Sequence, residues 1–289
     1  MFILTAYGSS RYVLQTLLCA FSIRARMPVA NVMVYTDQPR LFAEHGFATH
    51  ALEPLELVFM RGVLDFPHRI KIEVLLDASL RWSHESPLTY VDGDMYLQQP
   101  ATESRHTSLV MHKFEGEIGS SFHARLNSFL IKNAEAISKS PYRGMQSGMK
   151  MYNAGLIGLP CSPDVPLFLL QVRRMTDWLC VKFPEQIGWQ EQTAFSFLGQ
   201  NTYGIEADTM GFEHYWGCNT EVAEVLQRTP VDQIKLIGSD SARFDDLLAE
   251  AKSLSERPSH KWKLRKAKWK RSCKKRTVAR RARSLDKTA

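Results

Sequence analysis

Two aspartates placed two residues apart, Asp92 and Asp94, are the side chains whose spacing most directly indicates chemistry in this sequence. They follow residues 88–91, which read as a short apolar strand, and in an extended chain residues i and i+2 face the same side. Neighbouring carboxylates repel each other, and a divalent cation that prefers oxygen ligands removes that repulsion. Gly93 between them allows a sharp turn and the close approach of a ligand. We therefore predict a metal site at a strand end, against the alternative of an ordinary polar turn.

The segments around this pair predict a parallel sheet. Residues 2–5 and 32–37 read as strands on either side of an amphipathic helix over 13–24, and this order is a βαβ unit. Ligands of such α/β sheets gather at the carboxyl ends of the strands. The pattern further predicts strands over 53–59, 108–112, 150–159 and 234–237, and helices near 70–78, 128–138, 166–182, 190–198 and 245–253.

Composition limits the class of protein. The chain has 289 residues and is 44% apolar, enough for one large core or two modest ones. No apolar run is long enough to span a bilayer, and the N-terminus does not read as a secretory signal. The five cysteines are widely spaced and form no Cys-x-x-Cys pair, which argues against a disulfide framework or a structural zinc site. We therefore expect a reducing, cytoplasmic compartment.

Charge divides the chain unevenly. The whole chain is +7, but residues 257–289 hold 15 Lys and Arg and one acid, so that residues 1–256 are net negative. We therefore predict a folded domain over 1–256 and a basic amphipathic tail over 257–289, with Trp262, Trp269 and Cys273 on one helical face. Such a helix is typical of attachment to an anionic membrane surface. The alternative is a disordered tail. We do not expect a nucleic-acid partner, because the acidic body offers no second basic patch.

Four segments resemble glycosyltransferases with the GT-A fold. Residues 90–95 (Tyr-Val-Asp-Gly-Asp-Met) resemble their Asp-x-Asp strand end, and residues 5–7 (Thr-Ala-Tyr) lie where the family has its first nucleotide-binding loop. Residues 152–158 are similar to the Asn-Ala-Gly segment of the glycogenin and bacterial lipopolysaccharide galactosyltransferase group. Residues 189–195 resemble the Asp-Gln or Glu-Gln helix start that follows it. The resemblance implies a Rossmann-like, mostly parallel sheet flanked by helices, with a nucleotide-binding half over about 1–100 and an acceptor-side half over 101–256.

The resemblance also implies a role for individual residues. Asp92 and Asp94 would hold Mn²⁺ or Mg²⁺ against the diphosphate of a nucleotide sugar, with a UDP-sugar as the expected donor. The residues expected to contact the donor are Thr5, Ala6, Tyr7, Arg11, Arg69, Lys71, Asp92, Gly93, Asn153, Ala154 and Gly155. For Arg69 and Lys71 a solvated helix face is equally plausible, and Asn153 to Gly155 can also form a simple bulge.

Glu191 and Gln192 are the candidate catalytic residues. The family places a nucleophile or a donor-positioning residue there, while Glu191 could instead serve as a general base or favour the helix dipole. The family's late His-x-x-Gly-x-x-Lys-Pro-Trp motif, which supplies a third metal ligand, has no evident match. His214 and Asp240 are the substitutes that the sequence offers, and His214 could equally line an acceptor site with Trp216. Retaining and inverting transfer both stay open.

The sequence therefore predicts a metal-dependent hexosyltransferase. It would move a sugar from a nucleotide-sugar donor to a glycan or glycolipid acceptor, as a cytoplasmic protein attached peripherally to the inner face of the plasma membrane. The competing hypothesis is a non-catalytic adaptor that binds membrane or nucleic acid and keeps the α/β fold.

Overall fold

The computed structural model describes residues 1–82, 87–101, 107–119, 124–183 and 189–256. The predicted amphipathic helix over 257–289 lies outside these residues. The described residues form two compact units. The first unit comprises 1–57, 88–101 and 209–256, and the second comprises the rest. Helix α3 (Pro54–Arg61) connects them in the chain.

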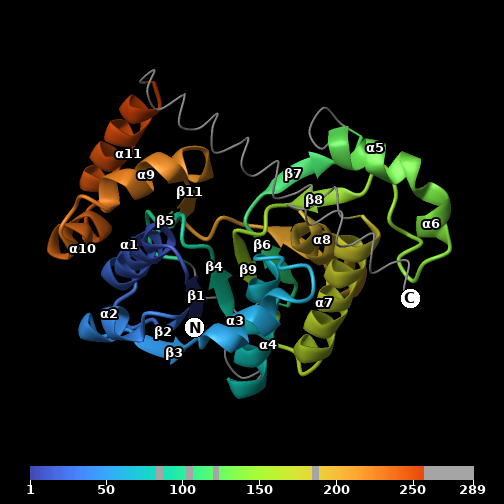
Figure 1. Ribbon diagram of the computed structural model, residues 1–289, viewed down its shortest axis with the longest axis horizontal. Coiled ribbons are helices and arrows are strands. Elements are labelled where there is room, and N and C mark those ends of the chain that lie inside the picture. The colour runs from blue at the N-terminus through green and yellow to red at the C-terminus, as the bar shows by residue number, and fades with distance from the viewer. Residues whose placement is uncertain (83–86, 102–106, 120–123, 184–188, 257–289) are drawn as a thin grey trace. The chain divides into compact units, whose positions relative to one another are not determined.

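The first unit contains a four-stranded parallel sheet (Figure 1). Its strands lie in the order β4 (Thr89–Val91), β1 (Phe2–Ala6), β2 (Val32–Thr36) and β3 (Ala48–Ala51). Phe2 of the central strand β1 pairs with Val32 on one side and with Thr89 on the other. All pairs are parallel, so the carboxyl ends of β1, β2 and β4 lie at the same edge of this sheet.

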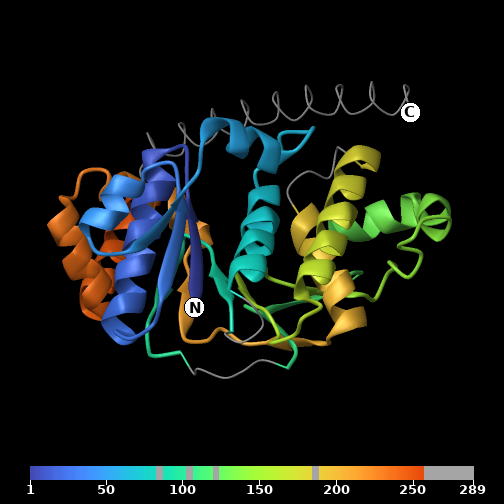
Figure 2. The same cartoon turned by 90° about the horizontal axis from the view of Figure 1, so that it is seen from below.

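Helix α1 (Ser10–Arg26) is the core helix of this unit. Ser9 caps it in an extended conformation (φ −88°, ψ 136°), and Arg24 and Arg26 in its last turn suit the negative end of the helix dipole. Helices α9 (Asn219–Leu226) and α10 (Val231–Ser239) pack on α1, and α11 (Ser241–Glu256) packs on α9 and α10. Both views show these orange and red helices beside the blue α1 (Figures 1 and 2). The unit is completed by α2 (Pro39–Glu44) and the short helix η2 (Trp216–Cys218).

The guanidinium of Arg26 joins the end of α1 to the strand and helices around it. Nη1 donates to the carbonyl of Gly238 (2.8 Å), and Nη2 donates to the hydroxyls of Tyr96 and Ser241 (2.7 Å each). The ring of Tyr96 stacks on Phe244 with centroids 3.7 Å apart. These contacts hold strand β5 (Met95–Leu97), which pairs antiparallel with β11 (Phe212–His214), in a defined place against α10 and α11.

The second unit combines short strands with a helical layer. Strand β6 (Leu109–Met111) pairs in parallel with β10 (Ile205–Ala207) and antiparallel with β9 (Leu156–Gly158), and β7 (Phe114–Glu117) pairs antiparallel with β8 (Lys150–Tyr152). Helix α7 (Val165–Lys182) packs against both α4 (Arg69–Arg81) and α8 (Gln190–Thr202). Two further helices are α5 (Ala124–Lys132) and α6 (Ala134–Ser138). The predicted α/β fold, with mostly parallel strands and flanking helices, is confirmed.

Three predicted strands differ from the structure, and the helix predicted near 128–138 is two helices, α5 and α6. Residues 53–59, predicted as a strand, form helix α3, because Pro54 opens the helix and Glu56 accepts a hydrogen bond from the amide of Glu53 (3.3 Å). Residues 234–237, also predicted as a strand, lie in α10. Residues 150–159 form two strands, β8 and β9, with Asn153 to Gly155 between them. No described helix is long and apolar enough to cross a membrane.

Candidate functional site

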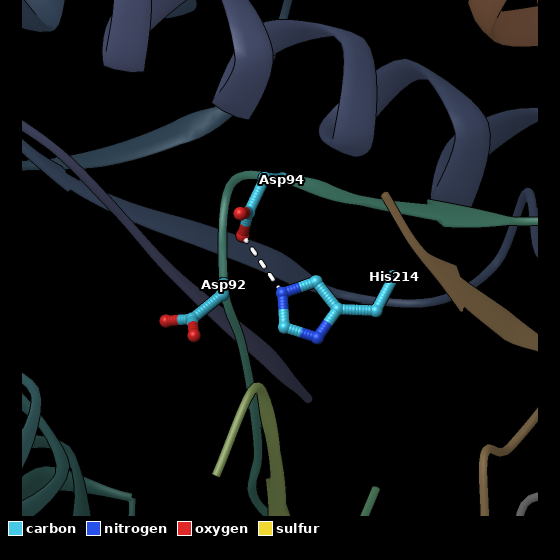
Figure 3. A group of neighbouring side chains, drawn as sticks. All are labelled: Asp92, Asp94 and His214. Carbon is cyan, nitrogen blue, oxygen red and sulfur yellow. Dashed lines mark ion pairs between the residues drawn. The ribbon is translucent and has the colours of Figure 1, made fainter. Parts of the chain in front are cut away.

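Asp92, Asp94 and His214 of the first unit form a cluster that could hold a metal ion (Figure 3). Each offers one ligand atom, and these atoms lie within 4.8 Å of one another. Nε2 of His214 is 3.3 Å from Oδ1 of Asp94, and the two side chains are 10% and 19% exposed. The predicted pair of carboxylate ligands is therefore joined by an imidazole.

The secondary structure explains why these three side chains meet. Asp92 follows directly on β4, and Asp94 directly precedes β5. Strand β11 pairs with β5 so that His214 is opposite Met95, the residue after Asp94. The amide of Tyr215 donates to the carbonyl of Asp94 (3.2 Å), which continues this pairing past the strand end.

Asn219 holds the Asp94 carboxylate from the other side. Its Nδ2 donates to Oδ2 of Asp94 (3.1 Å). The backbone carbonyl of Asn219 accepts a hydrogen bond from Nε2 of Gln15 on α1 (2.8 Å). Asp94 therefore has His214 at one oxygen and Asn219 at the other, which limits the rotation of the carboxylate. Asn219 was not predicted as a site residue.

Gly93 is packed against α1. A Cβ at this position would collide with Oγ1 of Thr16 and would come 3.3 Å from its backbone nitrogen. The hydroxyl of Thr16 is within hydrogen-bond distance of the carbonyls of Thr5 (3.0 Å) and Tyr12 (2.9 Å), so it is held in place. Packing against Thr16 therefore explains why a glycine lies between the two aspartates. The predicted role of Gly93 in the close approach of a ligand stays a separate prediction.

The charges of the cluster shift the pKa of Asp94 itself and of the neighbouring Cys19. Burial favours the neutral form of Asp94, but the hydrogen bonds and charge of His214, together with Asn219, outweigh it and lower the pKa of Asp94. Burial, with the negative charges of Asp94 and Asp92, raises the pKa of the Cys19 thiol well above its usual value. Cys19 therefore stays protonated at neutral pH and does not compete as a thiolate ligand.

The donor set fits a divalent cation. Two carboxylate oxygens and one imidazole nitrogen converge on a small space, and this combination suits Mn²⁺ better than an oxygen-only ion such as Ca²⁺. Among the described residues, Asp240 is outside the cluster. It ends α10, and its carboxylate accepts from the amide of Ala242 (2.9 Å). Of the two proposed substitutes for the third ligand, the structure therefore brings His214 to the aspartates.

A sequence signal for His214 was available. Residues 214–217 read His-Tyr-Trp-Gly, which has the spacing of the first half of the His-x-x-Gly motif. The second half, Lys-Pro-Trp, is absent, so the sequence left the third ligand open between His214 and Asp240.

The carboxyl edge of the parallel sheet gathers other predicted residues of the first unit. Thr5 and Ala6 end β1, and the hydroxyl of Thr5 is 2.8 Å from that of Tyr90 on β4. Tyr7 follows, and the amide of Gly8 donates to Oδ2 of Asp37 (2.7 Å), a residue at the end of β2 that was not predicted. Arg11 lies in the first turn of α1, with Nη2 3.8 Å from Oε1 of Glu224. These positions suit a nucleotide site, and their predicted role remains a prediction.

In the second unit, Glu115 links two predicted residues. Its Oε1 accepts from Nδ2 of Asn153 (2.8 Å), and its Oε2 accepts from Nε2 of Gln192 (2.7 Å). Oδ1 of Asn153 accepts from the amide of Gly155 (2.9 Å), so the Asn-Ala-Gly segment is a structured turn. Sequence reasoning missed Glu115, although acids at alternate positions in Phe114–Glu117 were a usable signal.

The two basic residues of α4 have different surroundings. Nζ of Lys71, a residue only 4% exposed, donates to the carbonyl of Ala154 (2.7 Å) and so supports the Asn-Ala-Gly turn. Arg69 pairs with Glu73 (2.6 Å) and, through Nε, with Asp177 (2.7 Å). Burial lowers the pKa of Arg69, but the hydrogen bond and charge of Asp177 outweigh it, so the pKa is raised. Neither residue lies on a solvated helix face.

Glu191 has a different partner from Asn153 and Gln192, which both donate to Glu115. Its Oε1 lies 3.5 Å from Nδ1 of His68, and the Glu191 side chain is 6% exposed. The structure therefore pairs one predicted catalytic residue, Gln192, with Glu115 and the other, Glu191, with His68.

Comparison with known proteins gives fold-level similarities only. No family model and no curated protein matches the chain. Among solved structures, the galactosyltransferase LgtC, in complex with donor and acceptor sugar analogs, aligns with a TM-score of 0.49 and 11% identity over 82% of this chain and 95% of its own. Mouse xyloside xylosyltransferase 1 aligns with a TM-score of 0.47 and 9% identity over 71% and 83%. The glycosyltransferase GlyE of Streptococcus pneumoniae aligns with a TM-score of 0.42 and 11% identity over 80% and 52%. All three are glycosyltransferases, the class of enzyme that the sequence motifs resemble.

Proposed function

We propose that this protein is a metal-dependent glycosyltransferase that moves a hexose from a UDP-sugar to a glycan or glycolipid acceptor. The observation that supports this most strongly is the Asp92, Asp94 and His214 cluster at the carboxyl end of β4. A cation held there would neutralise charge on the departing diphosphate, which makes cleavage of the bond to the sugar easier.

The chain's own residues would bind and orient the substrates. The end of β1 and Asp37 would contact the nucleoside, since they lie at the same sheet edge as Asp92. Asn153 and Gln192 each have an amide group fixed by Glu115, and fixed amides can select sugar hydroxyls by their donor and acceptor pattern. Ordered side chains of this kind reduce the entropy lost when the sugar is held for reaction.

The first test is donor use by the full-length protein. A panel of nucleotide sugars is screened with and without Mn²⁺ for thermal stabilisation and for release of nucleoside diphosphate. A ligand present at 100 times its Kd stabilises a fold by about 2.7 kcal/mol, so a selective donor is readily detected. We expect stabilisation by a UDP-sugar that depends on Mn²⁺.

Asp94→Asn is the matched loss-of-function variant, and Asp240→Asn is its control. Both remove one carboxylate charge, but Asp240 is outside the cluster. We expect Asp94→Asn to lose metal-dependent binding and turnover, whereas Asp240→Asn keeps both. An absence of metal-dependent nucleotide binding with every donor contradicts the enzyme and favours the non-catalytic adaptor.

We further propose that the protein acts at the cytoplasmic membrane face, attached through residues 257–289. This rests on the sequence charge of that segment, since basic residues near an anionic surface contribute about 1 kcal/mol each. The test is sedimentation of the full chain with anionic vesicles. A variant with Lys266, Lys268 and Lys270 changed to Gln should bind them more weakly, and equal binding contradicts the proposal.

A further inference from the structure

The carboxylate of Asp94 has a partner at each of its two oxygens. Oδ1 lies 3.3 Å from Nε2 of His214, and Oδ2 accepts a hydrogen bond from Nδ2 of Asn219 (3.1 Å). The Asp94 side chain is 19% exposed, so solvent competes little with these partners. Because hydrogen bonds weaken steeply when their angles change, the carboxylate cannot turn without losing one of them. Its orientation is therefore fixed before a cation binds.

Asn219 is itself held in place. Its Oδ1 is within hydrogen-bond distance of Oγ1 of Thr220 (3.4 Å), and an ionised carboxylate only accepts, so the amide turns its NH₂ group to Asp94. The backbone carbonyl of Asn219 accepts from Nε2 of Gln15 (2.8 Å), a residue of α1 that is 2% exposed. Asn219 is also the first residue of α9, which packs on α1. The core helix of the first unit therefore determines where the amide lies.

Divalent cations use carboxylates in different ways. Ca²⁺ accepts many oxygens in a flexible geometry and often takes both oxygens of one carboxylate. Mg²⁺ is smaller and requires a near-ideal octahedral geometry, and Mn²⁺ shares the octahedral preference. In the cluster, Oδ1 of Asp94 is the oxygen beside His214, while Oδ2 is engaged by Asn219. Turning both oxygens toward a cation beside His214 breaks this hydrogen bond, and that cost falls on Ca²⁺.

We propose that Asn219 makes the site selective: by holding Oδ2 of Asp94, it leaves Oδ1 as the ligand and so favours Mn²⁺ and Mg²⁺ over Ca²⁺. This inference rests on the cation site of the proposed function, but not on sugar transfer. Asn219 acts through Asp94 and is therefore a positioning residue. His214 has a separate effect, because an imidazole nitrogen suits Mn²⁺ better than Mg²⁺ and Ca²⁺, which prefer oxygen. The two residues therefore contribute to different preferences.

The test is calorimetric titration of the full-length protein with Mn²⁺, Mg²⁺ and Ca²⁺ in turn. Asn219→Leu keeps nearly the shape of the side chain but removes the hydrogen-bond donor. We expect its affinity for Mn²⁺ and Mg²⁺ to fall by about 10- to 100-fold, the usual effect of losing a ligand's hydrogen-bond partner. Its affinity for Ca²⁺ should fall by less than about threefold, because Asp94 can then offer both oxygens.

Two further variants define what is specific to Asn219. Gln227→Leu removes an amide donor at the other end of α9, where Nε2 of Gln227 donates to Oγ of Ser10 (2.8 Å) in an exposed place. This control should leave all three affinities unchanged. His214→Ala should lower the affinity for Mn²⁺ more than that for Mg²⁺, whereas Asn219→Leu should lower both alike.

A merely structural role of Asn219 predicts a different result. Local loss of structure lowers the three affinities by the same factor and leaves their ratios unchanged. Infrared spectra give a second readout, because the spacing of the two carboxylate stretching bands differs between binding through one oxygen and through two. Ca²⁺-loaded Asn219→Leu should show the two-oxygen pattern. If thermal unfolding shows that Asn219→Leu is not folded, Asn219→Ala takes its place.

The outcomes separate this role from the proposed function. A wild type that prefers Ca²⁺, or a preference for Mn²⁺ over Ca²⁺ that changes by less than about threefold in the Asn219 variant, overturns the role of Asn219. If the wild type binds no Mn²⁺, the cation site fails, and both the proposed function and the role of Asn219 fail with it. A lost preference in a protein that binds no nucleotide sugar supports the role of Asn219 and removes only sugar transfer.

Discussion

Gly93→Ala places a methyl group where α1 already lies. The new Cβ would collide with Oγ1 of Thr16 and would lie 3.3 Å and 3.4 Å from its backbone N and Cα. The hydroxyl cannot easily retreat, since the carbonyls of Thr5 and Tyr12 lie within 3.0 Å of it. The turn that joins the two aspartates must then move away from α1.

The structure allows the size of this effect to be estimated. One methyl group forced into a closely packed contact costs about 1–3 kcal/mol, and we expect about 2 kcal/mol of unfolding free energy. For a chain of this size that is a decrease in Tm of roughly 4–8 °C. Because Gly93 lies between two of the proposed metal ligands, its displacement should also weaken Mn²⁺ binding by about tenfold or more, the usual effect of misplacing ligand supports.

A double-mutant cycle with Thr16→Ala tests the cause. Thermal unfolding and calorimetric Mn²⁺ titration are measured for the wild type, both single variants and the double variant. Removal of Oγ1 should reduce the cost of Gly93→Ala by at least about 1 kcal/mol, because contacting residues couple by this much. The remaining contacts with the Thr16 backbone keep the rescue incomplete.

Gly217→Ala is the control for this cycle. Gly217 lies close to His214 in the chain, and a Cβ there meets no heavy atom within 4 Å. We expect its stability to stay within about 0.5 kcal/mol of wild type. Packing is refuted as the reason for Gly93 if Gly93→Ala is as mild as Gly217→Ala. It is also refuted if Gly93→Ala costs the same with and without the Thr16 hydroxyl, which would favour ligand approach instead.

Three further predictions concern the surroundings of the site. Arg26→Met leaves the carbonyl of Gly238 without its guanidinium donor and should cost about 3 kcal/mol in denaturant unfolding, whereas Arg243→Met, at an exposed ion pair, should cost less than about 1 kcal/mol. Asp94 has a lowered pKa in the fold, so it stabilises the metal-free protein above its unfolded pKa. That stability is lost as the pH falls through the folded value, and acid unfolding of Asp94→Asn should therefore show a shallower pH dependence. Glu115→Gln should lower kcat/KM by about tenfold to a hundredfold without changing Mn²⁺ affinity, and an unchanged kcat/KM contradicts a role in holding the two amides.

Much of the first unit's sheet could be predicted from the local strand–helix–strand pattern and from the rule that a βαβ unit has parallel strands. The βαβ unit over β1, α1 and β2 requires parallel strands, and parallel strands end at one edge. The aspartates after β4 then had to lie near the loop after β1, since Phe2 pairs with both Val32 and Thr89. The pairing of β1 with β2 follows from the local pattern, whereas the pairing of Phe2 with Thr89 is a contact distant in the sequence that the structure supplies.

The two strands that proved to be helices show where local pattern fails. In α3, Leu55 and Phe59 are exposed (80% and 74%), so their apolar character does not mark a buried strand. In α10, Ile234 and Gly238 form the buried face of a helix, and a Cβ on Gly238 would collide with Phe21 of α1. The apolar run 234–237 therefore reflects packing against α1, which a window of four residues cannot reveal.

The candidate third ligand stayed open between His214 and Asp240 in the sequence for a different reason. A metal requires only the imidazole and a backbone that presents it, and here pairing of β11 with β5 presents His214 to Asp94. In this chain Asn219 and the backbone of Tyr215 hold Asp94 in place without a Lys-Pro-Trp segment. A candidate metal ligand is therefore identified first by its side-chain donor atom and by the strand that presents it. The match of the flanking residues to a family motif comes second.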